Sequence, residues 1–92
     1  MAQYVESGTP VNITGTNTVS IASGSLLGFY VNSTTGGTLV LKVGANGAST
    51  GTAISGTITP GIGWHSYPAY CPSGLHATIA NTLDVTLIFA AG

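Results

Sequence analysis

The residues with the greatest chemical potential lie in one short segment, positions 61–72. This segment holds the only tryptophan, the only cysteine, one of two histidines and two of four tyrosines: Trp64, His65, Tyr67, Tyr70 and Cys71. Trp and Tyr side chains offer large, rigid contact area for a neighbouring subunit or a sugar. Our first expectation for Trp64 is nevertheless that it fills the centre of a small core, with subunit contact second and ligand stacking third. The candidate contacts with another subunit or partner are Trp64, His65, Tyr67 and Tyr70, together with Tyr4.

A metal site or a catalytic site is harder to build from the residues present. A closed zinc site needs four ligands and a catalytic one three, and the candidates are His65, Cys71 and His76. A nucleophilic triad would combine a serine or Cys71 with a histidine and Asp84, but the sequence has no G-x-S-x-G motif. Only Glu6 and Asp84 are available as a pair of catalytic carboxylates. The sequence therefore predicts no enzymatic activity, no metal and no cofactor.

Charge is almost absent from this chain of 92 residues. Only Glu6, Lys42 and Asp84 are charged, and the formal net charge is −1. Surfaces selected for solubility carry charge on roughly a quarter to a third of their positions. A neutral surface rich in Ser, Thr, Asn and Gly instead suits a protein that is docked in an assembly. With one basic residue the chain lacks the cationic groups that bind a phosphate backbone, so we expect no nucleic-acid partner.

The thiol and the N-terminal sequence bear on the compartment. Cys71 has no second cysteine with which to form an internal disulfide or a metal site, and we expect it to be a small buried apolar residue. The first residues lack the basic start and apolar run of a signal peptide. No stretch approaches the roughly 18 apolar residues of a membrane helix. We therefore expect synthesis in a cytoplasm and no membrane association.

The spacing of apolar residues predicts strands. Leu83, Val85, Leu87 and Phe89 alternate with other residues, as on a half-buried strand. The same period is found at 19–21, 27–31, 39–43 and 75–79. No segment keeps a helical period over three turns, and 14 glycines with many threonines disfavour helices.

Turn signals divide these strands. The sequence TTGG at 34–37 predicts a hairpin between strands at 26–33 and 38–43, residues 44–51 predict a longer loop, and residues 80–82 predict a link between the last two strands. The expected fold is all-β, a single compact antiparallel β-sandwich or jelly-roll-like domain of about seven to eight short strands. The domain would span residues 1–92, with residues 1–10 as a possible N-terminal arm.

The sequence also resembles a family. The runs LLGFYVNSTTGGTLVLK at 26–42, GTAISGTITP at 51–60, GWH at 63–65 and GLHATI at 74–79 are similar to small all-β virion proteins of tailed bacteriophages, and most of all to head-decoration (cement) proteins. The likeness covers most of the chain and consists of strand and turn patterns. The resemblance implies a protein at the capsid surface, often a homotrimer, that clamps neighbouring major capsid subunits. It carries over no catalytic or ligand-binding residue.

The near absence of charge and the family resemblance lead to the same functional expectation. A decoration protein would bind the outer surface of the major capsid lattice and stabilise the head, by burying apolar surface in many copies. Two alternatives remain open. A tail-fibre or adhesin-type module would display the region of Trp64 and Tyr70 to host surface glycans, and a cellular filament or coat subunit would be equally poor in charge.

Overall fold

The computed structural model describes residues 8–91 and confirms the all-β class. The elements are β1 (Thr9–Ile13), β2 (Asn17–Ser20), β3 (Gly24–Val43), the 3₁₀ turn η1 (Ala45–Gly47), β4 (Thr52–Ala53), β5 (Gly63–Cys71) and β6 (Leu75–Ala91). Residues 9 and 10 of the predicted arm belong to β1, and residues 1–7 lie outside the described residues. Within residues 8–91 no helix is long and apolar enough to span a bilayer.

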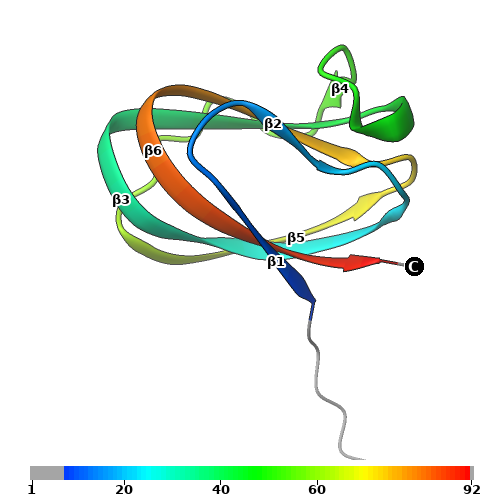
Figure 1. Ribbon diagram of the computed structural model, residues 1–92, viewed down its shortest axis with the longest axis horizontal. Helices are drawn as coiled ribbons and strands as arrows, with labels where there is room; N and C mark the ends of the chain where they lie inside the picture. The colour runs from blue at the N-terminus through cyan, green and yellow to red at the C-terminus, as the bar shows by residue number, and fades with distance from the viewer. Residues whose placement is uncertain (1–7, 92) are drawn as a thin grey trace, which may run out of the picture.

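All six strands belong to one antiparallel sheet that is built on β3 and β6 (Figure 1). These two long strands pair along their whole lengths, from Gly24 opposite Ala91 to Val43 opposite Leu75. β5 pairs with the first part of β3, and β1 pairs with the last part of β6. We call this region the β1–β5 half. β4 and β2 flank the other ends of β3 and β6, and this region is the β2–β4 half.

The two halves meet at a bend that β3 and β6 make together. Gly36 and Asn81 both have positive φ, +62° and +63°, and the Nδ2 of Asn81 donates to the carbonyl of Gly36 at 2.9 Å. Thr35 and Gly36 both lie opposite Thr82, which marks a bulge. Left-handed residues and bulges let a strand bend sharply while its pairing continues on either side.

This bend corrects two sequence predictions. The hairpin at 34–37 and the link at 80–82 were wrong as chain reversals, because β3 and β6 continue through both positions. The turn residues instead form a corner, which is why the sheet has six strands, two of them very long, and not seven or eight short ones. Neither the β-sandwich nor the jelly-roll arrangement is confirmed, since the six strands form one sheet. The loop at 44–51 was predicted correctly and contains η1.

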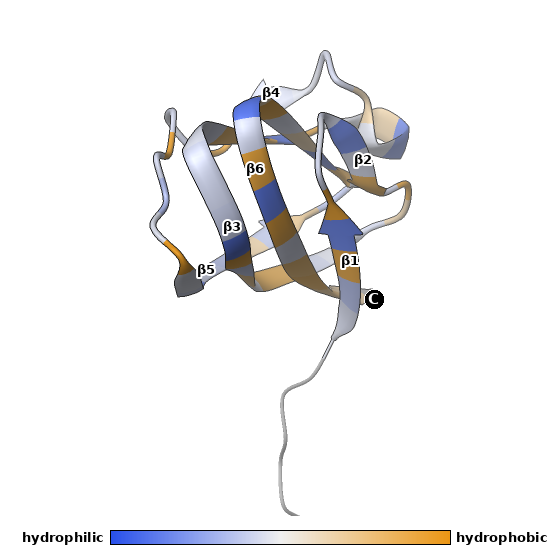
Figure 2. Ribbon diagram, turned by 60° about the vertical axis from the view of Figure 1, so that its left-hand side comes forward, coloured by the Kyte–Doolittle hydropathy of each residue, from blue (hydrophilic) through white to orange (hydrophobic). Residues whose placement is uncertain are grey.

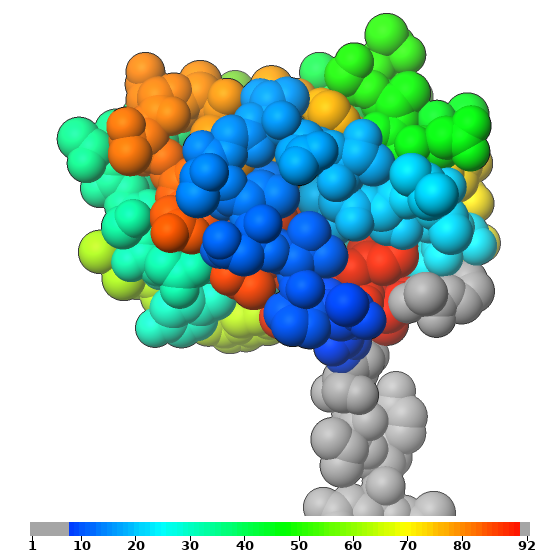
Figure 3. Space-filling view, viewed as in Figure 1, coloured from blue at the N-terminus to red at the C-terminus, as the bar shows by residue number. Residues whose placement is uncertain are grey.

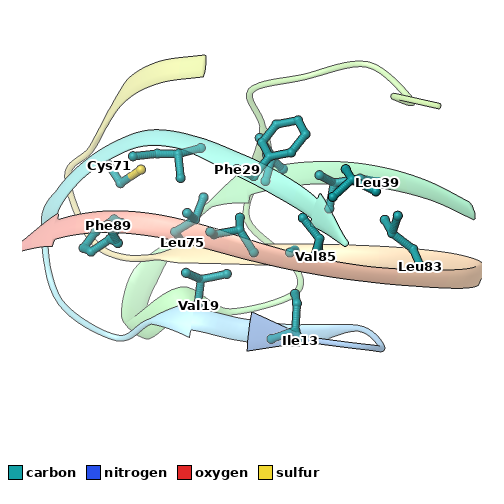
Figure 4. Close-up of a cluster of buried hydrophobic side chains, with 14 residues drawn as sticks. Ile13, Val19, Phe29, Leu39, Cys71, Leu75, Leu83, Val85 and Phe89 are labelled. Atoms are coloured by element: carbon teal, nitrogen blue, oxygen red, sulfur yellow. The ribbon is translucent and has the colours of Figure 1, made fainter. Parts of the chain in front are cut away.

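The hydrophobic core lies inside the folded sheet and receives side chains from both halves (Figure 4). The predicted alternation in β6 is confirmed: Leu83, Val85, Leu87 and Phe89 are all buried, and Figure 2 shows the resulting bands of hydrophobic and hydrophilic residues along that strand. The remaining members of the core are Ile13, Val19, Leu26, Phe29, Val31, Leu39, Leu41, Cys71, Leu75 and Ala77.

Two positions depart from the predicted alternation. A bulge in β3 between Leu26 and Gly28 shifts the face by one residue, so Leu26 is buried while Leu27 is only half-buried. β2 ends at Ser20, so Ile21 lies in a turn and is 71% exposed instead of sharing the buried face of Val19. In both cases a local backbone irregularity overrides the period of two.

Candidate functional site

Side chains of β5 alternate between the two faces of the sheet. Trp64 and Tyr70 point outward and are 50% and 68% exposed, whereas His65 and Tyr67 are half-buried on the inward face. The predicted core role of Trp64 was therefore wrong. The period of two that buries Cys71 at the end of β5 places every even-numbered residue of the strand outside. Of the five predicted contact residues, Tyr4 lies outside the described residues.

The two inward side chains hold the loop before β5. The imidazole of His65 stacks on Phe29 with ring centroids 5.3 Å apart, and its Nε2 bonds to the carbonyl of Gly61 at 2.8 Å. The hydroxyl of Tyr67 donates to the carbonyl of Ile54. Both polar groups are thus engaged within the chain, and the outward pair on β5 is the part of the predicted set that is exposed.

Tyr30 of β3 joins Trp64 on the outer face of the β1–β5 half. Tyr30 is 46% exposed and lies directly opposite Trp64 in the sheet register. On its other side Tyr30 faces Thr86 of β6, which in turn faces Asn12 of β1. We call Trp64, Tyr30, Thr86 and Asn12 the Trp64 row, since opposed residues share one face and lie about 4.5–5.5 Å apart. Sequence analysis missed Tyr30, although its place between buried Phe29 and Val31 was the available signal.

Gly28 makes room for the indole of Trp64. A Cβ atom on Gly28 would lie only 2.6 and 2.7 Å from Cζ2 and Cη2 of Trp64, and 2.5 Å from the carbonyl oxygen of His65. The six-membered ring therefore rests directly against the backbone of β3. Packing of this kind limits the ring to few orientations while half of the side chain remains exposed.

Polar side chains continue the Trp64 row and are linked by hydrogen bonds. The Nδ2 of Asn12 donates to Oδ1 of Asp84 at 2.7 Å, to Oγ1 of Thr86 at 3.1 Å and to the carbonyl of Val85 at 3.2 Å. The Nδ2 of Asn32 donates to the same Asp84 oxygen at 3.3 Å and to the same Thr86 hydroxyl at 3.1 Å. We call Asn12, Asn32, Asp84 and Thr86 the amide cluster.

The outer face of the β2–β4 half is covered by the loop of residues 44–51. The hydroxyl of Thr18 donates to the carbonyl of Gly47 at 2.9 Å, and the N–H of Asn46 donates to the carbonyl of Ser73 at 3.0 Å. Lys42, whose ammonium donates to the carbonyl of Ser49 at 3.4 Å, lies opposite His76. Lys42 and Asp84 therefore have separate partners in separate halves.

His76 is the one buried polar side chain found among residues 8–91. It is 5% exposed, and neither Nδ1 nor Nε2 has a hydrogen-bond partner within the described chain. Its neighbours in the sheet register are Thr18 on β2 and Lys42 on β3. A buried imidazole without partners is costly, whereas the side-chain amides of Asn12 and Asn32 on the other half both donate hydrogen bonds.

The residues considered above as metal ligands are not brought together within residues 8–91. Within residues 8–91 no three His, Cys, Asp or Glu side chains come together in a way that could hold a metal ion. Burial raises the pKa of the Cys71 thiol, and a hydrogen bond with the backbone of Leu26 lowers it by a smaller amount. Because the thiolate is the nucleophile, a fully buried thiol of raised pKa is unreactive. This part of the chain also encloses no pocket.

Of the three large apolar side chains that are most exposed beyond the Trp64 row, Ile21 and Tyr70 lie at one end of the molecule, and Ile62 lies before the start of β5. Ile21 belongs to the turn 21–23 that joins β2 to β3, and Tyr70 precedes the turn 72–74 that joins β5 to β6. A Cβ on Gly74 would lie 2.7 Å from the carbonyl oxygen of Ser20, so the two turns are adjacent. We call them, with Tyr70, the turn end. It lies opposite the corner (Figure 1), and Figure 3 shows residues near 21, in cyan, beside the yellow residues that follow β5.

Comparisons with known proteins do not assign the chain. No family model matches the sequence, no curated protein matches it, and no solved structure matches it. A functional assignment therefore depends on the surfaces described above.

Proposed function

We propose that this chain is a structural virion protein, a capsid decoration (cement) protein that binds the outer surface of the major capsid lattice. The observation that carries the proposal is a nearly uncharged surface on which large apolar side chains stay exposed, two of them, Ile21 and Tyr70, at the turn end. Lys42 and Asp84 are the charged residues of the described chain, and both are engaged within it. A surface of this kind gains more from a permanent neighbour than from bulk water.

The turn end is the part that would contact the shell. Ile21 and Tyr70 are the two most exposed large apolar residues there, at 71% and 68%. β1 begins at Thr9, opposite Phe89 near the end of β6, so residues 1–7 with Tyr4 precede a strand that starts on this side of the molecule.

The edge of β5 is less suited to the contact. Among residues 8–91, β5 pairs only with β3, which leaves its other edge without a partner strand over nine residues. Pro68 lies within this edge, and a proline has no N–H to donate to an added strand. Side-chain contact at the turn end is thus favoured over strand addition along β5.

Stabilisation of the head would come from many modest contacts. Each 100 Å² of apolar surface removed from water contributes roughly 2.5 kcal/mol before the costs of association are subtracted. A homotrimer would raise the effective concentration of each remaining contact once one protomer had bound. No catalytic step is part of this role.

A tail-fibre or adhesin module is the second candidate, and the exposed Trp64 row favours it. The two candidates differ in location and copy number. A decoration protein covers the head in many copies, whereas an adhesin is found in few copies near the tail.

The proposal is tested by co-sedimentation of the purified chain with expanded heads that lack it. We expect saturable binding that changes little with salt, because few charges are present to be screened. Substituting Ile21→Ser together with Tyr70→Ser should weaken binding at least about tenfold. The matched control is Ile62→Ser, since Ile62 is 69% exposed but lies at the other end of β5. Absence of binding by the unaltered chain would contradict the proposal.

A further inference from the structure

The outer face of the β1–β5 half presents an aromatic surface followed by a polar one. Trp64 and Tyr30 are both about half exposed and lie side by side on adjacent strands. Thr86 and Asn12 continue the same row across the next two strands. With strands about 4.8 Å apart, a row across four strands is about 14 Å long. This length accommodates an extended ligand of a few ring-sized units.

The polar end of the row has hydrogen-bonding capacity that the chain does not use. Oδ1 of Asp84 accepts two amide bonds, but no bond within residues 8–91 is found for its Oδ2, nor for the side-chain carbonyls of Asn12 and Asn32. The hydroxyl oxygen of Thr86 accepts from both amides, which leaves its O–H free to donate. Acceptors and a donor are therefore grouped on one exposed surface.

The amide cluster is held in place before any ligand arrives. Asn12 and Asn32 each bond to the same two side chains, so the carboxylate of Asp84 and the hydroxyl of Thr86 have little rotational freedom. The ring of Trp64 is confined in turn by the backbone at Gly28. Polar groups that are already ordered lose less entropy on binding.

The charge and chemistry of the face select the class of ligand. No Lys or Arg lies in the row or the amide cluster, and the one formal charge is the Asp84 carboxylate, so an anionic ligand would be repelled. The C–H face of a pyranose ring packs well on the electron-rich face of an aromatic ring. Sugar hydroxyls both donate and accept hydrogen bonds, as the amide cluster requires.

We propose that the Trp64 row and the amide cluster form a binding site for a neutral oligosaccharide, with sugar rings stacked on Trp64 and Tyr30 and hydroxyls bonded to Asp84, Asn12, Asn32 and Thr86. The site is about six residues of β5 away from Tyr70, which is about 20 Å along an extended strand. The site is therefore separate from the turn end. The proposal applies whether the chain belongs to the head or to the tail of a virus particle.

The test is an NMR titration of the full chain with four neutral hexasaccharides: cellohexaose, chitohexaose, maltohexaose and mannohexaose. We expect at least one of them to bind at micromolar to millimolar concentration. The shifted signals should be the indole N–H of Trp64 and the side-chain amides of Asn12 and Asn32. A sialylated trisaccharide serves as the anionic comparison and should bind more weakly.

Matched variants separate this site from general adhesion. Trp64→Ala and Tyr30→Ala should each weaken binding at least about tenfold. Asp84→Asn replaces the carboxylate with an amide, whose oxygen is a weaker acceptor, and should weaken binding by a smaller factor. Tyr70→Ala removes a more exposed aromatic side chain from the same face of β5 and should leave binding unchanged. Unchanged amide spectra away from the site verify that each variant is folded.

Three outcomes would overturn the proposal. These are no binding of any neutral hexasaccharide, binding that Trp64→Ala leaves intact, or preference for the sialylated sugar. Capsid binding by the turn end is measured separately, with Ile21 and Tyr70 variants, so loss of one proposal leaves the other standing.

Discussion

The two halves of the sheet share one core but differ on their outer faces. In the β2–β4 half the loop of residues 44–51 covers the sheet and buries His76 without hydrogen-bond partners. In the β1–β5 half the outer face is open, with Trp64 and Tyr30 about half exposed. The polar groups beside these aromatic residues bond to one another. Burial of His76 thus destabilises the β2–β4 half locally. The outer face of the β1–β5 half has ordered side chains that are exposed and can contact a ligand.

The buried His76 of the β2–β4 half affects stability, whereas the exposed face of the β1–β5 half bears on function. Burial of an unpartnered imidazole is destabilising, so His76 marks a place where the covering loop is retained despite a local penalty. Cross-strand packing accounts for the buried part of Trp64 and Tyr30, but about half of each side chain stays exposed. The open face is thus the one whose composition points to a ligand or a partner.

The largest expected effect tests whether the halves form one cooperative unit. Leu87 of the β1–β5 half and Leu41 of the β2–β4 half are both fully buried. Leu87→Ala and Leu41→Ala should each lower the free energy of unfolding by about 2–5 kcal/mol, measured by urea titration at one protein concentration. A single transition in both variants is expected, because both leucines contact the same core. Two separate transitions would show that the halves unfold independently.

A glycine substitution tests how firmly the covering loop is held. Gly74 has φ of +127°, and a Cβ there would lie 2.5 Å from the backbone N of Gly47. Gly74→Ala should lower the free energy of unfolding by about 1–3 kcal/mol and speed amide hydrogen exchange in residues 44–51. Gly15→Ala is the control, since nothing lies within 4 Å of its Cβ position and no positive φ is required. If both variants are equally stable, the loop is not docked as described.

The two histidines should respond in opposite directions to the same change. His76→Leu removes a buried polar group without partners and should raise the free energy of unfolding by about 1 kcal/mol. His65→Leu removes the bond to Gly61 and should lower it by about 1 kcal/mol. Thermal and urea unfolding of both variants measure the difference. A loss of stability in His76→Leu would mean that the imidazole has a favourable role under the loop.

The smallest effect concerns Cys71 on the inner face of the open half. The folded thiol has a pKa raised by burial, so above the ordinary thiol pKa of about 8.5 the unfolded chain loses a proton that the folded chain keeps. The unfolded state then binds fewer protons, and stability falls as pH rises. The urea midpoint should therefore fall more between neutral and alkaline pH in the unaltered chain than in Cys71→Ala. If the urea midpoints of both proteins change equally with pH, the Cys71 thiol is accessible to water in the folded state.

Sequence analysis predicted the elements whose period was regular. The strand at 83–89 and the loop at 44–51 were correct because alternation and turn residues each report on local conformation. The corner was not predictable in this way. The residues TTGG at 34–37 are compatible with either a reversal or a bend, and only pairing with Asn81, 45 residues further along the chain, decides between them.

The candidate site was predicted only in part. Sequence analysis selected Trp64 and Tyr70 as contacts, and both are exposed. The amide cluster joins Asn12, Asn32 and Asp84 from three different strands, and no spacing within one strand reveals that they meet. Whether Trp64 faces inward or outward depends on which alternate residues of β5 face the core. The sequence of residues 61–72 alone did not determine this.

We propose that the chain binds the capsid through its turn end and leaves the outer face of the β1–β5 half open to solvent. The most direct measurement is a cryo-EM map of the virus particle that carries the chain, at a resolution that distinguishes the two ends. We expect density in many copies on the head, with Ile21 and Tyr70 against the shell and Trp64 facing solvent. Absence of the chain from the head, or a chain seated with Trp64 buried against the shell, would contradict the claim.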